Sequence, residues 1–143
     1  GGGVYFTEDV DEAVEALRPS LAFSLGAMGS RQFNFYNAVY SRAGYADIAK
    51  EVQRLWIDGS RDEARKLVPA EMVLKSNLIG TDQMVKERLR AYRDAGVNTL
   101  SASLRRRGAG RGLGPALSLN DRIEALGRLV DLVKEVNQEP AKL

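Results

Sequence analysis

The sequence carries many helical patterns but few strands, and this imbalance limits the folds that the chain can adopt. Residues 97–104 (VNTLSASL) alternate apolar and small polar side chains with the period of two that is typical of a strand. A helical pattern capped by Thr81 precedes this segment and ends at Gly96, and another helical pattern follows it. Helix, strand and helix in this order make one crossover of a parallel sheet, whose strands need partners. Residues 4–6 supply one further strand end, so most of the required sheet is not evident in the sequence.

The remaining apolar patterns are helical. Between residues 45 and 58, apolar side chains recur at helical spacing and predict an amphipathic helix that Gly59 ends. Trp56 lies on this stripe, where packing in a core is more common than stacking on a ligand. The last helix has a wide apolar face, formed by Ile123, Leu126, Leu129, Val130, Leu132, Val133 and Val136. We therefore predict an α/β fold that is mostly helical, with one or two parallel strands and residues 97–104 as the clearest strand.

Composition excludes several classes of function. The chain has 143 residues, 44% hydrophobic and 28% charged, which predicts one domain, residues 1–143, with a real core. Cysteine and histidine are absent, so we predict no disulfide, no thiolate chemistry and no metal site. The net charge of +2 is nearly balanced and argues against a nucleic-acid partner. No apolar run approaches the ~20 residues that span a bilayer, so we expect a cytoplasmic protein without a membrane partner.

The stretch LGAMGSRQFNFYN, residues 25–37, has an unusual composition, because aromatic residues and asparagines directly follow a glycine break. Phe33, Phe35 and Tyr36 either pack in a core or contact a ligand, and packing is the more common role. We therefore expect these three rings to be largely buried. Asn34 is either a turn or cap residue or a polar group that faces a site.

Acidic residues surround the start of the first helical pattern: Glu8, Asp9, Asp11 and Glu12. Carboxylates in this position favour the positive end of the helix dipole. None has an obvious buried partner that would raise its pKa, so we predict capping and solvation rather than acid–base catalysis.

Three segments together resemble the C-terminal part of the luciferase-like monooxygenase superfamily: LRPSLAFSLGAMGSRQFNFYNAVYSRAGY, GSRDEARKLVPAEMV and LIGTDQMVKERLRAYRDAGVNTL. The branch with the greatest similarity is that of the oxidoreductases that depend on a deazaflavin, coenzyme F-420. The resemblance extends in order over residues 4 to 104 and more loosely over the final helix. Gly80-Thr81, Arg88 and Gly96-Val97 carry its most specific part.

The resemblance implies the C-terminal part of a (β/α)8 TIM barrel, a fold that takes about 250 residues. Residues 4–6 would then form a late strand and residues 97–104 the eighth. Residues 20–78 would form a helical insertion, and residues 79–143 the last α/β/α unit. The implied function is hydride transfer between coenzyme F-420, or alternatively FMN, and a small organic substrate. The implied partner is a second copy or a complementary N-terminal half.

Two groups of residues are candidate binding sites. Barrel enzymes often hold phosphate after strands seven and eight, where this chain has a loop of arginines and glycines that could bind the anionic part of a cofactor: Arg105, Arg106, Gly108, Gly110 and Arg111. A solvated loop is the more favoured interpretation, and nucleic-acid binding is a weak one. The resemblance also implies a substrate pocket lined by Met28, Ser30, Asn34 and Tyr36.

No residue is predicted to be catalytic, because the family's principal catalytic contacts lie in its N-terminal half. The chain alone is therefore predicted to be inactive. A non-enzymatic helical module that mediates subunit association is the alternative function.

Overall fold

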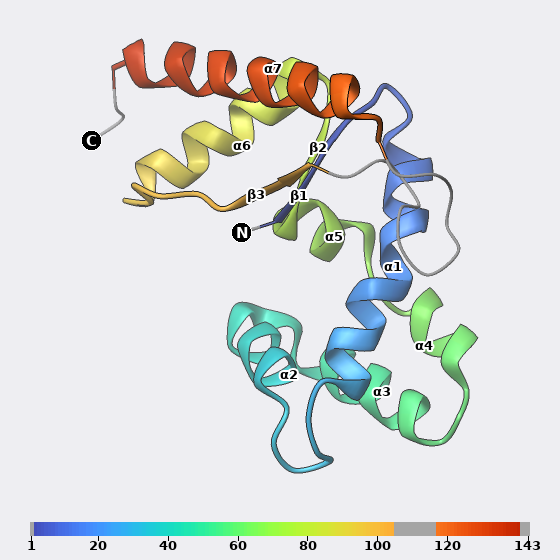
Figure 1. Ribbon diagram of the computed structural model, residues 1–143. Coiled ribbons are helices and arrows are strands. Elements are labelled where there is room, and N and C mark those ends of the chain that lie inside the picture. Colours follow the sequence, from blue (N-terminus) through green and yellow to red (C-terminus); the bar gives the residue numbers. More distant parts are fainter. Residues whose placement is uncertain (1, 105–116, 141–143) are drawn as a thin grey trace. The chain divides into compact units, whose positions relative to one another are not determined.

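The computed structural model describes residues 2–104 and 117–140. They form two compact units, one from residues 2–13 with the described part of 74–143, the other from residues 14–73. The first unit contains a small parallel sheet with helices, and the second is helical (Figure 1). Helices account for 69% of the described residues, which confirms the predicted predominance of helix. The proposed division at residues 20–78 and 79–143 stays a prediction.

The sheet of the first unit has three parallel strands: β1 (Gly2–Phe6), β2 (Leu78–Gly80) and β3 (Ala102–Leu104). Their order is β2-β1-β3, and Val4 in the middle strand lies opposite both Leu78 and Leu104. The expectation of one or two strands was too low, because β2 is a run of only three residues directly before a helix.

The prediction of a strand over residues 97–104 was wrong for residues 97–101, and β1 is the longest strand instead. The pairing of β3 with β1 explains this, since Gly2 lies opposite Ala102. Residues 97–101 therefore have no described residue of β1 opposite them. A strand without a neighbour lacks the ladder of hydrogen bonds that holds it extended.

Two helices of the first unit, α6 (Asp82–Asp94) and α7 (Leu119–Gln138), lie next to each other on one face of the strands (Figure 1). Thr81 caps α6 as predicted, because its Oγ1 accepts a hydrogen bond from the backbone N–H of Met84. Ser118 and Asp121 form a capping box at the start of α7. The core between helices and strands consists of Val4, Leu78, Val85, Leu89, Leu129, Leu132 and Val136.

The strand order is informative about the barrel. A (β/α)8 barrel runs through its strands in chain order, which would place β2 between β1 and β3. In the described residues β1 takes this middle place. The structure therefore shows a mixed fold with a small parallel sheet, and the barrel itself stays a prediction.

The second unit is built from helices. They are most of α1 (Val10–Ala27), α2 (Phe35–Tyr40), a π-helical turn (Ser41–Tyr45), α3 (Ala46–Ile57), α4 (Arg61–Lys66) and the start of α5 (Ala70–Ser76). The helix predicted over residues 45–58 is confirmed as α3. The core of this unit includes Leu25, Val52, Val68 and Met72, which are fully buried.

Gly26 allows α1 and α3 to approach closely. A Cβ atom at this position would lie 2.4 Å from Cβ of Trp56, so a larger residue would force the helices apart. The Trp56 ring is half buried and meets Phe23 edge to face, with ring centroids 5.7 Å apart. Close packing of α1 against α3 therefore requires glycine at position 26, the first glycine of the LGAMGS stretch.

None of the helices in the described ranges is both long enough and apolar enough to cross a membrane.

Candidate functional site

The carboxyl ends of the three strands define the candidate site. The strands are parallel and end at Phe6, Gly80 and Leu104, so their carboxyl ends share one edge of the sheet. In open parallel sheets, ligands bind in the crevice outside this edge. Thr7 continues the edge of β1, because its N–H donates to the carbonyl of Gly80 at 3.1 Å.

Three side chains from distant parts of the chain meet beside this edge. Nε of Arg128, on α7, donates to Oδ1 of Asp82, the first residue of α6, at 2.6 Å. The guanidinium carbon of Arg128 also lies 4.3 Å from the centroid of the Phe6 ring. The side chains of Arg128 and Asp82 are 47% and 45% exposed, so solvent and ligands can reach the pair. Phe6, Asp82 and Arg128 are called the edge cluster below.

Sequence reasoning did not find the edge cluster. Phe6 and Asp82 adjoin strand ends, which is a usable signal once both strands are known. Arg128 gives no such signal, because it lies in the middle of a helix whose pattern predicts only an apolar face.

The acidic residues near the start of α1 act as predicted where their contacts are described. Oδ1 of Asp9 accepts a hydrogen bond from the N–H of Glu12 at 2.9 Å, and the N–H of Asp9 donates to Oγ1 of Thr7. The carboxylate of Asp9 is thus a cap that satisfies a free N–H group of the first turn.

Asn34, a predicted pocket residue, is buried and ties α2 to the end of α1. Its Oδ1 accepts from the N–H of Asn37, which caps α2, while Nδ2 donates to the carbonyls of Leu25 at 2.8 Å and Ser24 at 3.2 Å. Nδ2 of Asn37 adds a bond to the carbonyl of Ala49 on α3 at 2.6 Å. The two asparagines therefore satisfy helix carbonyls, and the amide of Asn34 has no N–H left for a ligand.

Met28 and Ser30, also predicted pocket residues, lie in an exposed turn before α2. Gly29 has a φ of 141°, and a Cβ there would lie 2.3 Å from the carbonyl oxygen of Phe33. Ser30 closes the turn, because its N–H donates to the carbonyl of Phe33 and its Oγ accepts from the N–H of Phe33, both at 3.0 Å. The turn thus requires glycine at position 29, the second glycine of the stretch.

The expected burial of the aromatic residues was wrong. Phe33 and Phe35 are 80% and 70% exposed, and Tyr36, the fourth predicted pocket residue, is 40% exposed. The physical reason lies in Asn34 and Asn37, whose hydrogen bonds anchor the short helix α2 and leave it without buried residues. Polar side chains rather than buried rings thus anchor α2.

This exposure changes the expected effect of a mutation. Phe35→Ala should alter the free energy of unfolding by no more than about 0.5 kcal/mol, because substitutions at exposed positions are usually near neutral. Urea denaturation followed by circular dichroism measures the change. A cost above about 3 kcal/mol, typical of a phenylalanine removed from a core, would contradict the exposed position.

The predicted anion-binding loop, with Arg105, Arg106, Gly108, Gly110 and Arg111, lies outside the described residues.

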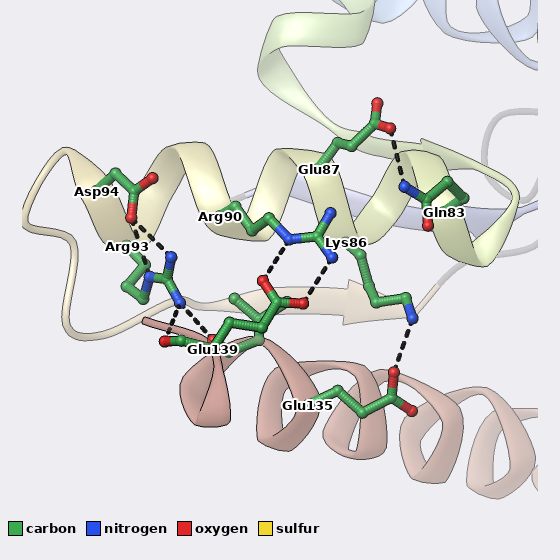
Figure 2. Close-up of polar contacts among 9 residues, drawn as sticks. Gln83, Lys86, Glu87, Arg90, Arg93, Asp94, Glu135 and Glu139 are labelled. Atoms are coloured by element: carbon green, nitrogen blue, oxygen red, sulfur yellow. Dashed lines mark hydrogen bonds and ion pairs between the residues drawn. The ribbon is translucent and has the colours of Figure 1, made fainter. Parts of the chain in front are cut away.

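Shifted pKa values occur in ion pairs that helix residues form. Arg90 on α6 donates two hydrogen bonds to the Glu139 carboxylate, at 2.5 and 2.6 Å, which raises the pKa of Arg90 and lowers that of Glu139 (Figure 2). Nζ of Lys86 donates one hydrogen bond to Oε2 of Glu135 at 2.8 Å. In the second unit, hydrogen bonds from Arg54 lower the pKa of Glu51. Such pairs link two helices or brace one helix, and they are not by themselves a sign of catalysis.

The Arg90–Glu139 pair predicts sensitivity to acid. A carboxylate with a lowered pKa stabilises the fold above its usual pKa range, and this contribution is lost as the pH falls through the lowered value. The free energy of unfolding should therefore drop as the pH falls below the usual pKa of glutamate, about 4.3, and it should drop less in Glu139→Gln. Urea denaturation at a series of pH values measures this, with the exposed Glu124→Gln on α7 as control. An identical pH dependence in the protein and Glu139→Gln would contradict the prediction.

A hollow of about 430 Å³ lies at the other end of the sheet. It is lined by residues of the segment before β3, including Val97 and Leu100, and by the ends of α6 and α7. The guanidinium of Arg93 is bonded there to Asp94 and to the carbonyls of Val136 and Glu139, which caps the end of α7 (Figure 2). These polar groups serve the fold, as is usual at the amino ends of parallel strands.

Within the described ranges, no group of three or more Asp or Glu residues is placed to hold a metal ion.

Comparisons with known proteins agree on one family. The family profile described as luciferase-like monooxygenase matches residues 1–99. A relative from Mycobacterium tuberculosis, named "Putative coenzyme F420-dependent oxidoreductase", is 33% identical over 97 residues, which are 68% of this chain and 28% of the relative. The chain thus spans less than a third of that relative's length. No solved structure matches. The match over most of its length shows that the chain belongs to the luciferase-like monooxygenase family.

Proposed function

We propose that this chain is part of an oxidoreductase that transfers hydride between coenzyme F-420 and a small organic substrate. The family match over residues 1–99 carries the proposal, and the name of the relative supports the choice of coenzyme F-420 over FMN. The family name contains the word monooxygenase and so supports a variant of this proposal, in which the cofactor is FMN and the substrate is monooxygenated.

The described residues fit such a cofactor in part. Coenzyme F-420 carries a phosphodiester and an acidic tail, and the guanidinium of Arg128 at the carboxyl edge is suited to an anionic group. When bound, the cofactor supplies the hydride chemistry, and the protein binds and orients it. No described side chain is assigned the role of proton donor or acceptor, so no catalytic step is derived.

We propose further that other parts of the enzyme complete the site. A barrel enzyme assembles its active site from loops that follow several strands, and the described sheet contributes three strand ends. The matched residues are 28% of the relative's length, so much of such an enzyme has no counterpart in the matched region. A complementary N-terminal half or a second copy would supply the missing loops.

A chimera tests the proposed function. The 97 residues of the M. tuberculosis relative that match this chain are replaced by the corresponding residues of this chain. Quenching of coenzyme F-420 fluorescence measures binding, with the unchanged relative as the positive control and FMN as the competing ligand. The proposal predicts saturable quenching by the chimera. A chimera that shows a cooperative thermal transition but binds neither cofactor would contradict it.

One observation favours the alternative of a non-enzymatic association module. Four large apolar side chains are exposed close together in sequence in the second unit: Met28, Phe33, Phe35 and Tyr36. Exposed apolar patches commonly mark sites of protein association. Analytical ultracentrifugation of the chain and of Phe33→Ser/Phe35→Ser decides whether these rings mediate association. Self-association through these rings, together with a folded chimera that binds no cofactor, would favour the alternative.

A further inference from the structure

The edge cluster contains a guanidinium that is held from two sides. Asp82 accepts from Nε of Arg128 at 2.6 Å, and the ring of Phe6 lies against the guanidinium at 4.3 Å. Asp82 opens α6 and Phe6 ends β1, so two separate elements fix one side chain of a third. An arginine side chain that is already ordered loses less entropy when it binds a ligand.

We propose that Arg128 binds an oxyanion, a phosphate or carboxylate group of a ligand that lies at the carboxyl edge of the sheet. Asp82 and Phe6 are the positioning residues for this contact. The inference goes beyond the proposed redox function, because it requires only that the ligand carry an oxyanion. It also concerns a residue outside the region that the family profile matches.

The free edge of the guanidinium supports this role. Within residues 2–104 and 117–140, only Nε of Arg128 has a hydrogen-bond partner, so Nη1 and Nη2 have no acceptor there. Paired N–H groups on these nitrogens match the two oxygens of a carboxylate or phosphate. An exposed ion pair with Asp82 alone would contribute little to stability, and it would not need the stacked ring.

The local charge is compatible with an incoming anion. Asp82 is the first residue of α6, where the free N–H groups of the helix carry a partial positive charge that offsets the carboxylate. Asp82 also bonds Nε rather than the Nη atoms, so it leaves the free edge open. The anion would therefore meet a guanidinium whose charge is only partly neutralised.

The position within the fold agrees with a ligand contact. Phe6 and Asp82 mark the carboxyl ends of β1 and β2, which is the edge where parallel sheets bind ligands. The hollow at the amino end of β3 offers no comparable guanidinium, because that of Arg93 is occupied by Asp94 and two carbonyls.

The test titrates the isotope-labelled 143-residue chain with inorganic phosphate and, separately, with acetate at constant ionic strength. The arginine side-chain NMR signals report binding at a named residue. We expect saturable shifts of the Arg128 signals. Saturation by phosphate alone would assign the oxyanion to a phosphate group, and saturation by both ions would include carboxylates.

Two variants and one control make the test specific. Arg128→Gln removes the charge, and Arg128→Lys keeps the charge but removes the paired N–H groups, so both should weaken phosphate binding at least tenfold. Binding by the variants is followed through the backbone N–H signals of Thr7 and Asp82. Arg122→Gln changes an exposed arginine on the same helix and should leave binding unchanged. Circular dichroism melts confirm that all four proteins are folded.

Two outcomes would overturn the proposal. One is the absence of saturable shifts in the folded wild-type chain. The other is phosphate binding by Arg128→Lys and Arg128→Gln that equals binding by the wild type. Neither outcome depends on the cofactor, so this inference and the proposed redox function can fail separately.

Discussion

The 143-residue chain alone should not accelerate hydride transfer from reduced coenzyme F-420 to a quinone acceptor. An active site of a barrel enzyme needs loops that follow several strands, and the described residues contribute three strand ends without an assigned proton donor. The chain should therefore lack the whole rate enhancement of a complete enzyme, which is typically about 10⁶-fold or more. Oxidation of the reduced cofactor, followed by absorbance, measures the rate.

The free cofactor with the same acceptor sets the reference rate. A chain confirmed as monomeric by ultracentrifugation should give this reference rate at every protein concentration. Robust turnover by the monomer would show that the site is complete within these 143 residues, contrary to the proposed division of the enzyme.

Leu25→Ala should lower the free energy of unfolding by about 2–5 kcal/mol. Leu25 is among the largest fully buried side chains of the second unit, and its removal costs the transfer free energy of the lost atoms and leaves a cavity. Its carbonyl would still accept the hydrogen bonds of Asn34 and Asn37, so the substitution isolates the contribution of side-chain packing. Urea denaturation followed by circular dichroism measures the change.

Leu67→Ala is the matched control, because Leu67 lies in the same unit but is 40% exposed. It should cost clearly less than Leu25→Ala. Equal costs for the two leucines would show that residues 14–73 do not pack around Leu25 as described.

Helices were predictable because their sequence signals, apolar spacing and capping residues, lie within the helix or next to it. The pattern over residues 45–58 and the cap at Thr81 depend on neighbours within one or two turns, and both are confirmed. The strands were less predictable. β2 has only three residues, too few to show a period, and residues 97–101 depend on a partner strand that no local pattern reveals.

The aromatic stretch shows a different limit of sequence reasoning. Their residue type predicts packing for Phe33 and Phe35, but the neighbouring Asn34 and Asn37 anchor the backbone through hydrogen bonds to α1 and α3. An amide that bonds a backbone carbonyl leaves no periodic signal in the sequence. The resemblance identified the family of this stretch correctly while the roles of its residues depended on tertiary contacts.

The edge cluster could not be predicted for the same reason. Arg128 and Asp82 are 46 positions apart, and the pair forms only because α7 lies beside α6. The predicted binding residues in the arginine–glycine loop stay predictions, as does the substrate pocket, in which the amide of Asn34 is already committed to backbone carbonyls.

Hydride transfer by the chimera tests the central proposal most directly. The M. tuberculosis relative carrying the matched residues of this chain is mixed with reduced coenzyme F-420 and a quinone acceptor, and absorbance follows the oxidation of the cofactor. We predict a rate well above that of the free cofactor and comparable with that of the unchanged relative. The assignment of this chain to an F-420-dependent oxidoreductase would be contradicted if the unchanged relative accelerated the oxidation of the cofactor but the folded chimera gave only the rate of the free cofactor.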